Sequence, residues 1–214
     1  MSAPVLLDGP RVGPASGRPA RSLAILAHGY GSNGADLIGL VPHWRDALPD
    51  TAFVSPNAPE RCPGAPGGYQ WWPVWDQDRV AGARAAGPVL DAFIDAELAR
   101  HGLTEDRLAL VGFSQGTMLS LYVAPRRQRA IAGVAGYSGA LIDLDDAAVR
   151  SRPPILLVHG DADPMIPVAA FHAAEAALKR LNFPLATHVS RGLGHSIDME
   201  GLRLGGAFLA KVLA

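Results

Sequence analysis

The segment from Leu108 to Met118 constrains this chain more than any other, because an apolar run passes through Gly112-Phe-Ser-Gln-Gly116 into a sequence of helical character. A serine on a sharp turn between a strand and a helix needs small neighbours on both sides, and the two glycines supply them. The turn lifts the serine hydroxyl away from the sheet, and the positive end of the following helix points at it. The pattern predicts a nucleophile elbow centred on Ser114.

A serine hydroxyl is a weak nucleophile near neutral pH, so the motif predicts catalysis only if the chain also supplies a base and a group that orients it. The strand-like run 155–160 leads directly into Asp161 and Asp163. A carboxylate just past a strand end lies at the catalytic edge of a parallel sheet. We assign Asp163 as the orienting acid, because the loop has turned toward the serine at this position. Asp161 is expected to be a turn or capping residue.

The chain order serine, acid, histidine leaves three candidate histidines after Asp163. His172 falls in a helical stretch and His188 in a strand-like one, where structural or surface roles are expected. His195 follows two glycines in a loop before the last helix, and such a loop can bring an imidazole across the sheet edge to the serine. We therefore assign His195 as the base.

Negative charge that develops on a carbonyl oxygen needs fixed N–H donors, each contributing about 3 kcal/mol. One expected donor is the backbone N–H of Gln115, directly after the serine. The second is expected from the loop that follows the early strand 23–27, where the sequence reads His28-Gly-Tyr-Gly31. We assign the N–H of Tyr30, with an ordinary glycine-rich turn as the alternative.

A segment rich in proline and glycine, residues 56–68, leads straight into a group of tryptophans, Trp71, Trp72 and Trp75. Loops of this kind on a rigid sheet often line a site. We expect Trp72 to contact substrate, with simple filling of space over the sheet as the alternative. Met165 and Ile166 are expected to form walls for an acyl chain, whereas Met118 is expected in the core.

Several motifs that stand in one order along nearly the whole chain resemble the carboxylesterase/phospholipase family of α/β-hydrolases, which includes acyl-protein thioesterases. The resemblance implies serine esterase chemistry, with Ser114, Asp163 and His195 as the triad and the N–H groups of Tyr30 and Gln115 as oxyanion donors. The motifs are His28-Gly-Tyr-Gly31, Pro56-Asn-Ala-Pro59, Gln70-Trp-Trp72, Gly112-Phe-Ser-Gln-Gly116, Ser138-Gly139, His159-Gly-Asp-Ala-Asp-Pro164 with Pro167, and Gly194-His195.

The resemblance is to the bacterial carboxylesterase branch of this family, and one departure from the family pattern limits the likeness to the thioesterases. Thioesterase members tend to carry leucine after His-Gly and aspartate after the next glycine, whereas Tyr30 and Ser32 stand there in this chain. The departure weakens an acyl-protein thioesterase assignment.

Strand-like and helical segments alternate along the chain, which predicts a mostly parallel central sheet with helices on both faces. We expect an α/β-hydrolase fold without a large lid domain, formed by residues 1–214 as a single domain. The first strand is expected to pair as an antiparallel edge through a turn at 13–18, and Asp198 to cap the last helix. The predicted strands lie near Val5 and at 23–27, 52–55, 108–113, 131–136, 155–159 and 185–190. The predicted helices are 35–44, 82–101, 114–123, 168–180 and 199–212.

Composition and charge argue against several classes of binding partner. The formal net charge is −1 and the basic residues are scattered, which argues against a nucleic-acid partner. No run approaches the roughly 18 to 20 apolar residues of a membrane span, and the start of the chain lacks the features of a signal peptide. We expect a cytoplasmic protein without stable membrane insertion. Cys62 is the lone cysteine, so no intramolecular disulfide and no cysteine pair for a metal is expected.

These features predict a serine carboxylesterase that hydrolyses short- to medium-chain acyl esters through an acyl-enzyme, with no metal and no organic cofactor. A small-molecule ester is the expected partner, and a homodimer is left open. The enzymatic alternatives are a lysophospholipase or an acyl-protein thioesterase. A different class of function is a non-catalytic binding module for small molecules on the same fold.

Overall fold

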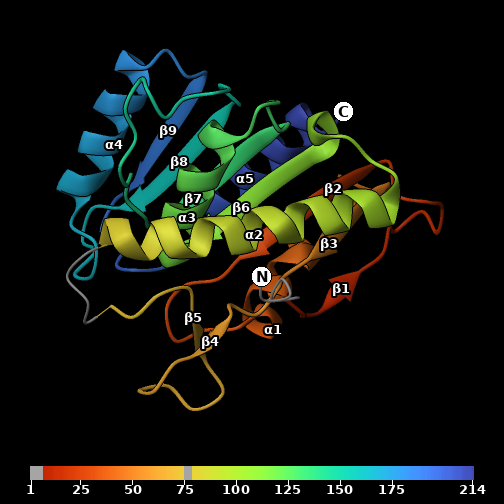
Figure 1. Cartoon of the computed structure of the whole chain (residues 1–214), viewed down its shortest axis with the longest axis horizontal. Helices are drawn as coiled ribbons and strands as arrows, with labels where there is room; N and C mark the ends of the chain where they lie inside the picture. The colour runs from red at the N-terminus through yellow and green to blue at the C-terminus, as the bar shows by residue number, and fades with distance from the viewer. Residues whose placement is uncertain (1–6, 75–78) are drawn as a thin grey trace.

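The computed structural model of the chain describes residues 7–74 and 79–214. Within these residues, seven strands form one sheet in the order β1-β3-β2-β6-β7-β8-β9 (Figure 1). Every neighbouring pair is parallel except β1 and β3, which are antiparallel. The mostly parallel sheet is as predicted. The strands are β1 (Arg11–Val12), β2 (Ser22–Ala27), β3 (Thr51–Val54), β6 (Leu108–Phe113), β7 (Gly133–Tyr137), β8 (Ile155–Gly160) and β9 (Leu185–Ser190).

The central strands are apolar along their whole length because both faces of the sheet are covered. All residues of β2 and β8 are buried, and so are those of β6 up to Gly112. The edge strand β9 has the mixed pattern of burial expected where only part of a strand is covered. Continuous apolar runs therefore become the interior of the sheet, and the mixed run becomes its edge.

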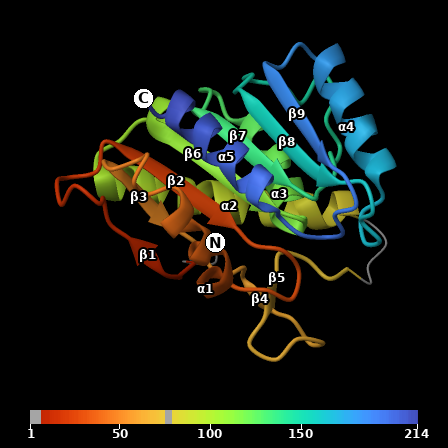
Figure 2. The ribbon, with the colours of Figure 1, turned by 180° about the vertical axis from the view of Figure 1, so that it is seen from behind.

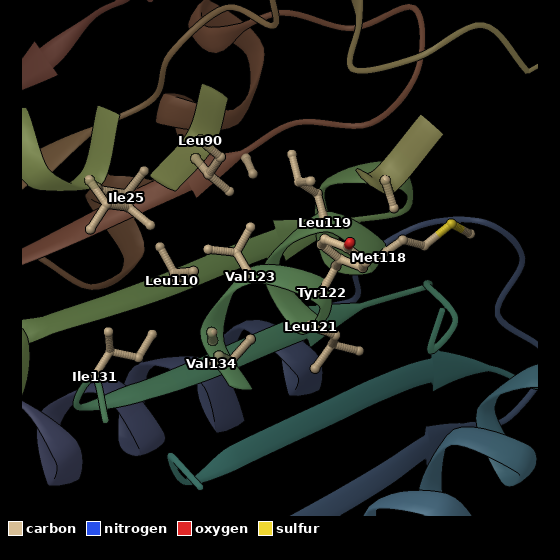
Figure 3. Packing of buried hydrophobic residues seen from close by; sticks show 14 of the residues in the cluster. Ile25, Leu90, Leu110, Met118, Leu119, Leu121, Tyr122, Val123, Ile131 and Val134 are labelled. Atoms are coloured by element: carbon tan, nitrogen blue, oxygen red, sulfur yellow. The ribbon is translucent and has the colours of Figure 1, made fainter. Parts of the chain in front are cut away.

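Helices cover both faces of the sheet (Figures 1 and 2). On one face lie α2 (Arg79–His101), α3 (Gln115–Val123) and α4 (Val168–Arg180), which share one buried apolar cluster with the sheet. Figure 3 shows part of this cluster, with residues of α3 beside Leu110 of β6 and Leu90 of α2. On the other face lie the 3-10 helix η1 (Ile38–His43) and α5 (Met199–Val212), whose cluster includes Trp44.

The predicted helix 35–44 is wrong as a single α-helix. The structure has a short α1 (Gly34–Leu37) followed by η1, which contains Pro42. Proline has no N–H to donate and its ring crowds the preceding turn, so a regular α-helix does not continue through this position. The last helix, α5, does start as predicted, since the side chain of Asp198 accepts a hydrogen bond from the N–H of Gly201.

The antiparallel edge strand β1 pairs with β3 rather than with the strand that follows the predicted turn at 13–18. The predicted strand near Val5 lies outside the described residues, as does Trp75. The chain forms a small hairpin of β4 (Glu60–Arg61), inside the segment 56–68 that was predicted as irregular, and β5 (Tyr69–Gln70), directly after that segment. Two further 3-10 turns, η2 (Glu105–Arg107) and η3 (Ala124–Arg126), flank β6 and α3.

None of the helices in the described ranges is long and apolar enough to cross a membrane.

Replacement of Gly116 by alanine is expected to destabilise the fold by about 3 kcal/mol or more, because its Cβ would stand 1.9 Å from the carbonyl oxygen of Ala27. Backbone atoms of a central strand cannot yield as a flexible side chain can. Gly39→Ala is the matched control, since Gly39 has open space around its Cβ position. Urea unfolding of both variants measures the difference, and similar midpoints would contradict the expectation.

Candidate active site

Ser114 lies between the end of β6 and the start of α3 with φ of 53° and ψ of −114°. A positive φ is uncommon for a residue with a side chain, and such strain costs about 1–3 kcal/mol. The turn is fixed on both sides, because the Ser114 N–H donates to the carbonyl of Tyr137 (2.9 Å) and its carbonyl accepts from the N–H of Met118 (3.1 Å). The backbone therefore holds the serine side chain in the strained geometry predicted for an elbow.

Asp163 and His195 form a hydrogen-bonded pair, with His195 Nδ1 2.7 Å from Asp163 Oδ2. The carboxylate side chain is fully buried, and its Oδ1 accepts from the N–H groups of Met165 (2.8 Å) and Ile166 (2.9 Å). Burial raises the pKa of Asp163, but the hydrogen bonds from Ile166, His195 and Met165 outweigh it and lower the pKa below 3.8. The ionised carboxylate thus holds Nδ1–H of the imidazole and leaves Nε2 as the acceptor.

The imidazole of His195 lies in the loop between β9 and α5, and its ring contacts Phe113, the residue before the serine (centroids 5.0 Å apart). The hydroxyl of Ser138, at the end of β7, donates to the carbonyl of Ser196 (3.2 Å) and ties this loop to the sheet. The loop from a distant part of the sequence is therefore fastened beside Ser114.

The other predicted candidates have different surroundings. Asp161 accepts a hydrogen bond from the N–H of Gly192 (2.6 Å), which fastens the loop that leads to His195. His172 is exposed on α4 and pairs with Glu175, and His188 lies on the edge strand β9. None of these three lines the cavity at Ser114.

The loop after β2 is shaped by a buried histidine. His28 Nδ1 lies 2.7 Å from the carbonyl oxygen of Gly29, and Nε2 lies 3.0 Å from the backbone N of Ala58. Because Ala58 N–H must donate to Nε2, the proton stands on Nδ1 and is donated to Gly29. In a trans peptide the N–H points away from the C=O, so this bond also sets the direction of the Tyr30 N–H.

The same loop touches the serine. A Cβ at Gly29 would stand 3.2 Å from Ser114 Cβ, so only glycine allows this approach without displacement. Gln115 opens α3, and the N–H groups of the first helical turn have no partner within the helix. The arrangement places both proposed N–H donors, those of Tyr30 and Gln115, in segments next to Ser114.

The side chain of Gln115 has a second role that the sequence did not indicate. Its Oε1 accepts from the N–H of Trp71 (2.9 Å) and its Nε2 donates to the carbonyl of Trp72 (2.8 Å). Trp71 also donates its ring N–H to the carbonyl of His28 (3.0 Å). The tryptophan segment, the loop after β2 and the helix after the serine are thereby joined.

A cavity of about 370 Å³ opens at Ser114, and its walls are mainly apolar. All the predicted site residues except Asp163 line it, and Asp163 stands behind His195. Met118 belongs to the core cluster as predicted and also reaches the cavity. Sequence reasoning missed Val74 and Arg79, which have no motif around them. The lining residues are Tyr30, Trp72, Val74, Arg79, Ser114, Gln115, Met118, Met165, Ile166 and His195.

A family model described as Phospholipase/Carboxylesterase matches residues 11–213. The chain belongs to this family. Esterase YpfH of Escherichia coli strain K12 is 30% identical over 190 residues, which cover 87% of this chain and 81% of that protein. Acyl-protein thioesterase 1 of Kluyveromyces lactis is 28% identical over 216 residues, covering 92% and 94%.

Among solved structures, the crystal structure of esterase PE8 superposes with a TM-score of 0.93 at 43% sequence identity, and the match covers 98% of this chain and 100% of that chain. Membership in the Phospholipase/Carboxylesterase family confirms the resemblance predicted from the motifs. It also confirms the α/β-hydrolase fold, and in the described residues no large lid domain is inserted into it.

Replacement of His28 by glutamine is expected to lower kcat about 10- to 100-fold, because the peptide that carries the Tyr30 N–H loses its anchor. It should also change how stability depends on pH. Burial lowers the pKa of His28 below 6.5, so its contribution to the unfolding free energy is full above that pH and is lost as the pH falls through the lower folded pKa.

Urea unfolding at pH 5, 6 and 7 and ester hydrolysis at pH 7 measure these two effects. His43→Gln is the control, because His43 is exposed in η1. The assigned role would be contradicted if lowering the pH from 7 to 5 reduced the unfolding free energy equally in wild type and His28→Gln.

Proposed function

We propose that this protein is a serine carboxylesterase that hydrolyses short- to medium-chain acyl esters. The observation that supports it best is that a strained serine and His195 line one mainly apolar cavity, with His195 hydrogen-bonded to the buried Asp163. The roles we assign are nucleophile for Ser114, general base and acid for His195, and orienting carboxylate for Asp163.

In the first step, His195 Nε2 takes the proton of Ser114 Oγ while the oxygen attacks the ester carbonyl. The imidazole becomes positively charged, and the ionised Asp163 that holds Nδ1–H stabilises this form. Asp163 stays ionised during the step, because two backbone N–H groups also donate hydrogen bonds to its carboxylate. The product of the attack is a tetrahedral intermediate with a negative oxygen.

The negative oxygen is received by the N–H groups of Tyr30 and Gln115. When the intermediate collapses, the bond to the alcohol oxygen breaks and the alcohol leaves with the proton from His195. Water then loses a proton to the same imidazole and attacks the acyl-enzyme, and the acid is released as Ser114 recovers its proton. Every atom and proton in this cycle is accounted for by the three side chains, two N–H groups, ester and water.

The proposed acyl length follows from the cavity. Its volume of about 370 Å³ lies at the lower end of the range of about 300–1,000 Å³ for small-molecule sites. Trp72 and Ile166, both buried, and the more exposed Met165 provide apolar walls. An acyl chain that outgrows these walls gains little further burial, so the rate is expected to stop rising at medium length.

A thioester carbonyl could be attacked by the same groups, and one relative favours testing it, because the Kluyveromyces lactis protein is named an acyl-protein thioesterase. The corresponding test uses a palmitoylated peptide thioester beside the ester series. Preference for the thioester over every ester would replace the proposed substrate class with this second one.

We expect release of 4-nitrophenol from an ester series of increasing acyl length to peak at short or medium chains and to depend on Ser114. Ser114→Ala should lower kcat by about 10⁶-fold, as expected when a triad nucleophile is lost. A fluorophosphonate should add one label to the wild type and none to the variant, as read by intact mass. Absence of both turnover and labelling in folded wild type would sink the proposal and favour a binding module.

Two aspartates in one loop give a matched pair for the orienting role. Asp163→Asn should lower kcat about 10⁴-fold, because the amide no longer selects the productive imidazole tautomer. Asp161→Asn removes a negative charge two positions away but keeps an oxygen that can accept from the Gly192 N–H, so its kcat should stay close to that of wild type. Equal losses in the two variants would show that the loop matters but Asp163 has no distinct role.

A further inference from the structure

Arg79 is the one permanently charged side chain among the residues that line the cavity at Ser114 within the described chain. It stands at the start of the described part of α2 and is exposed. The neighbouring wall is rigid, because a Cβ at Gly82 on the next turn of α2 would stand 2.4 Å from the ring of Trp72. Helix α2 is thus packed directly on a cavity wall, and this contact brings Arg79 to the cavity.

No carboxylate in residues 7–74 or 79–214 forms an ion pair with Arg79. Other arginines of the same side of the molecule do have such partners. Arg84 on the same helix lies 3.7 Å from Asp143, and Arg127 binds Asp95 at 2.7 Å. Arg79 thus lines the cavity without an acidic partner among residues 7–74 and 79–214.

A guanidinium binds a carboxylate or phosphate through two parallel hydrogen bonds. The proposed mechanism does not use such a group, since the oxyanion is received by backbone N–H groups. Arg79, Val74 and Met165 are all exposed, so the ionic attraction at this part of the cavity wall acts partly through water and is weakened by salt. A cation in this position favours substrates with a negative charge away from the scissile carbonyl.

We propose that Arg79 makes this enzyme selective for esters that carry an anionic group, a carboxylate or a phosphate, in addition to the ester bond. The inference rests on the proposed esterase function and names its substrate class. Arg79 contacts the anion and takes no part in bond making or breaking. Its contribution is the same before and in the transition state, so it appears in KM rather than in kcat.

The test compares charged and neutral esters of matched length. One pair places the charge on the acyl side: 4-nitrophenyl hydrogen adipate and its N-methylamide. The other places it on the alcohol side: 4-(butanoyloxy)butanoate and its N-methylamide. The wild type is expected to prefer the anion at least about tenfold in kcat/KM in one pair, which identifies the side, with the preference reduced by added KCl.

Arg79→Gln should abolish this preference through KM, so that kcat/KM falls at least about tenfold more for the anionic ester than for its neutral partner. Arg79→Lys keeps the positive charge but cannot form two parallel hydrogen bonds, so it should retain part of the preference for the anionic ester. Arg84→Gln is the matched control, because it removes a positive charge from the same helix but away from the cavity lining, and it should behave as wild type.

The outcomes separate this proposal from the esterase function itself. Turnover of the neutral esters with no anion preference in either pair, or an equal effect of Arg79→Gln and Arg84→Gln, overturns the role of Arg79 and leaves the esterase standing. Absence of turnover on all four esters, with no fluorophosphonate label on Ser114, overturns the function on which the proposal rests.

Discussion

The strained backbone of Ser114 exists because α3 is pressed against the sheet, and the rest of the site is arranged around that contact. Gly116 allows the helix to approach so closely that a methyl group there would overlap the carbonyl of Ala27 in β2. The hydrogen bond from Ser114 N–H to Tyr137 fixes the turn from the side of β7. Strain of about 1–3 kcal/mol persists only where its surroundings determine it. Here the surroundings are the central strands of the sheet and the helix packed on them, which hold the backbone of Ser114 in place.

Parallel strands explain why residues distant in sequence meet at this serine, because their carboxyl ends share one edge of the sheet. The loops after β2, β8 and β9 carry the proposed N–H donor, acid and base, and a buried polar side chain fastens each of them. His28 binds the first, Asp163 the second and the hydroxyl of Ser138 the third. His159 supports Asp163 from behind, since its buried Nε2 lies 2.8 Å from the carbonyl of Ile166 in the turn that donates to the carboxylate.

The sequence predicted those parts of the site that are formed by residues adjacent in the chain. A buried strand, a glycine-flanked serine and a helix are adjacent in the chain, so the nucleophile elbow could be recognised from sequence. Once the elbow was assigned, the acid and the histidine were expected after the serine in that order. The β4–β5 hairpin was missed because strands of two residues have no periodicity, and the pairing of β1 with β3 was missed because the two strands lie far apart in sequence. Arg79 was missed for a related reason. It reaches the cavity only because α2 packs on Trp72, a contact that no spacing along the chain reveals.

The hydrogen-bond partners of two histidines near the serine favour opposite protonation states. The proposed catalysis needs one histidine that can become positively charged and one that stays neutral. His195 is hydrogen-bonded to the carboxylate of Asp163, which in the proposed reaction stabilises a positive imidazole. His28 is fully buried and accepts from the N–H of Ala58 through Nε2, so a proton there would break a hydrogen bond and place a charge in the core. Burial accordingly lowers the pKa of His28. In the proposed reaction His195 gains a proton while His28 stays neutral, so the loop proposed to receive the oxyanion keeps its shape.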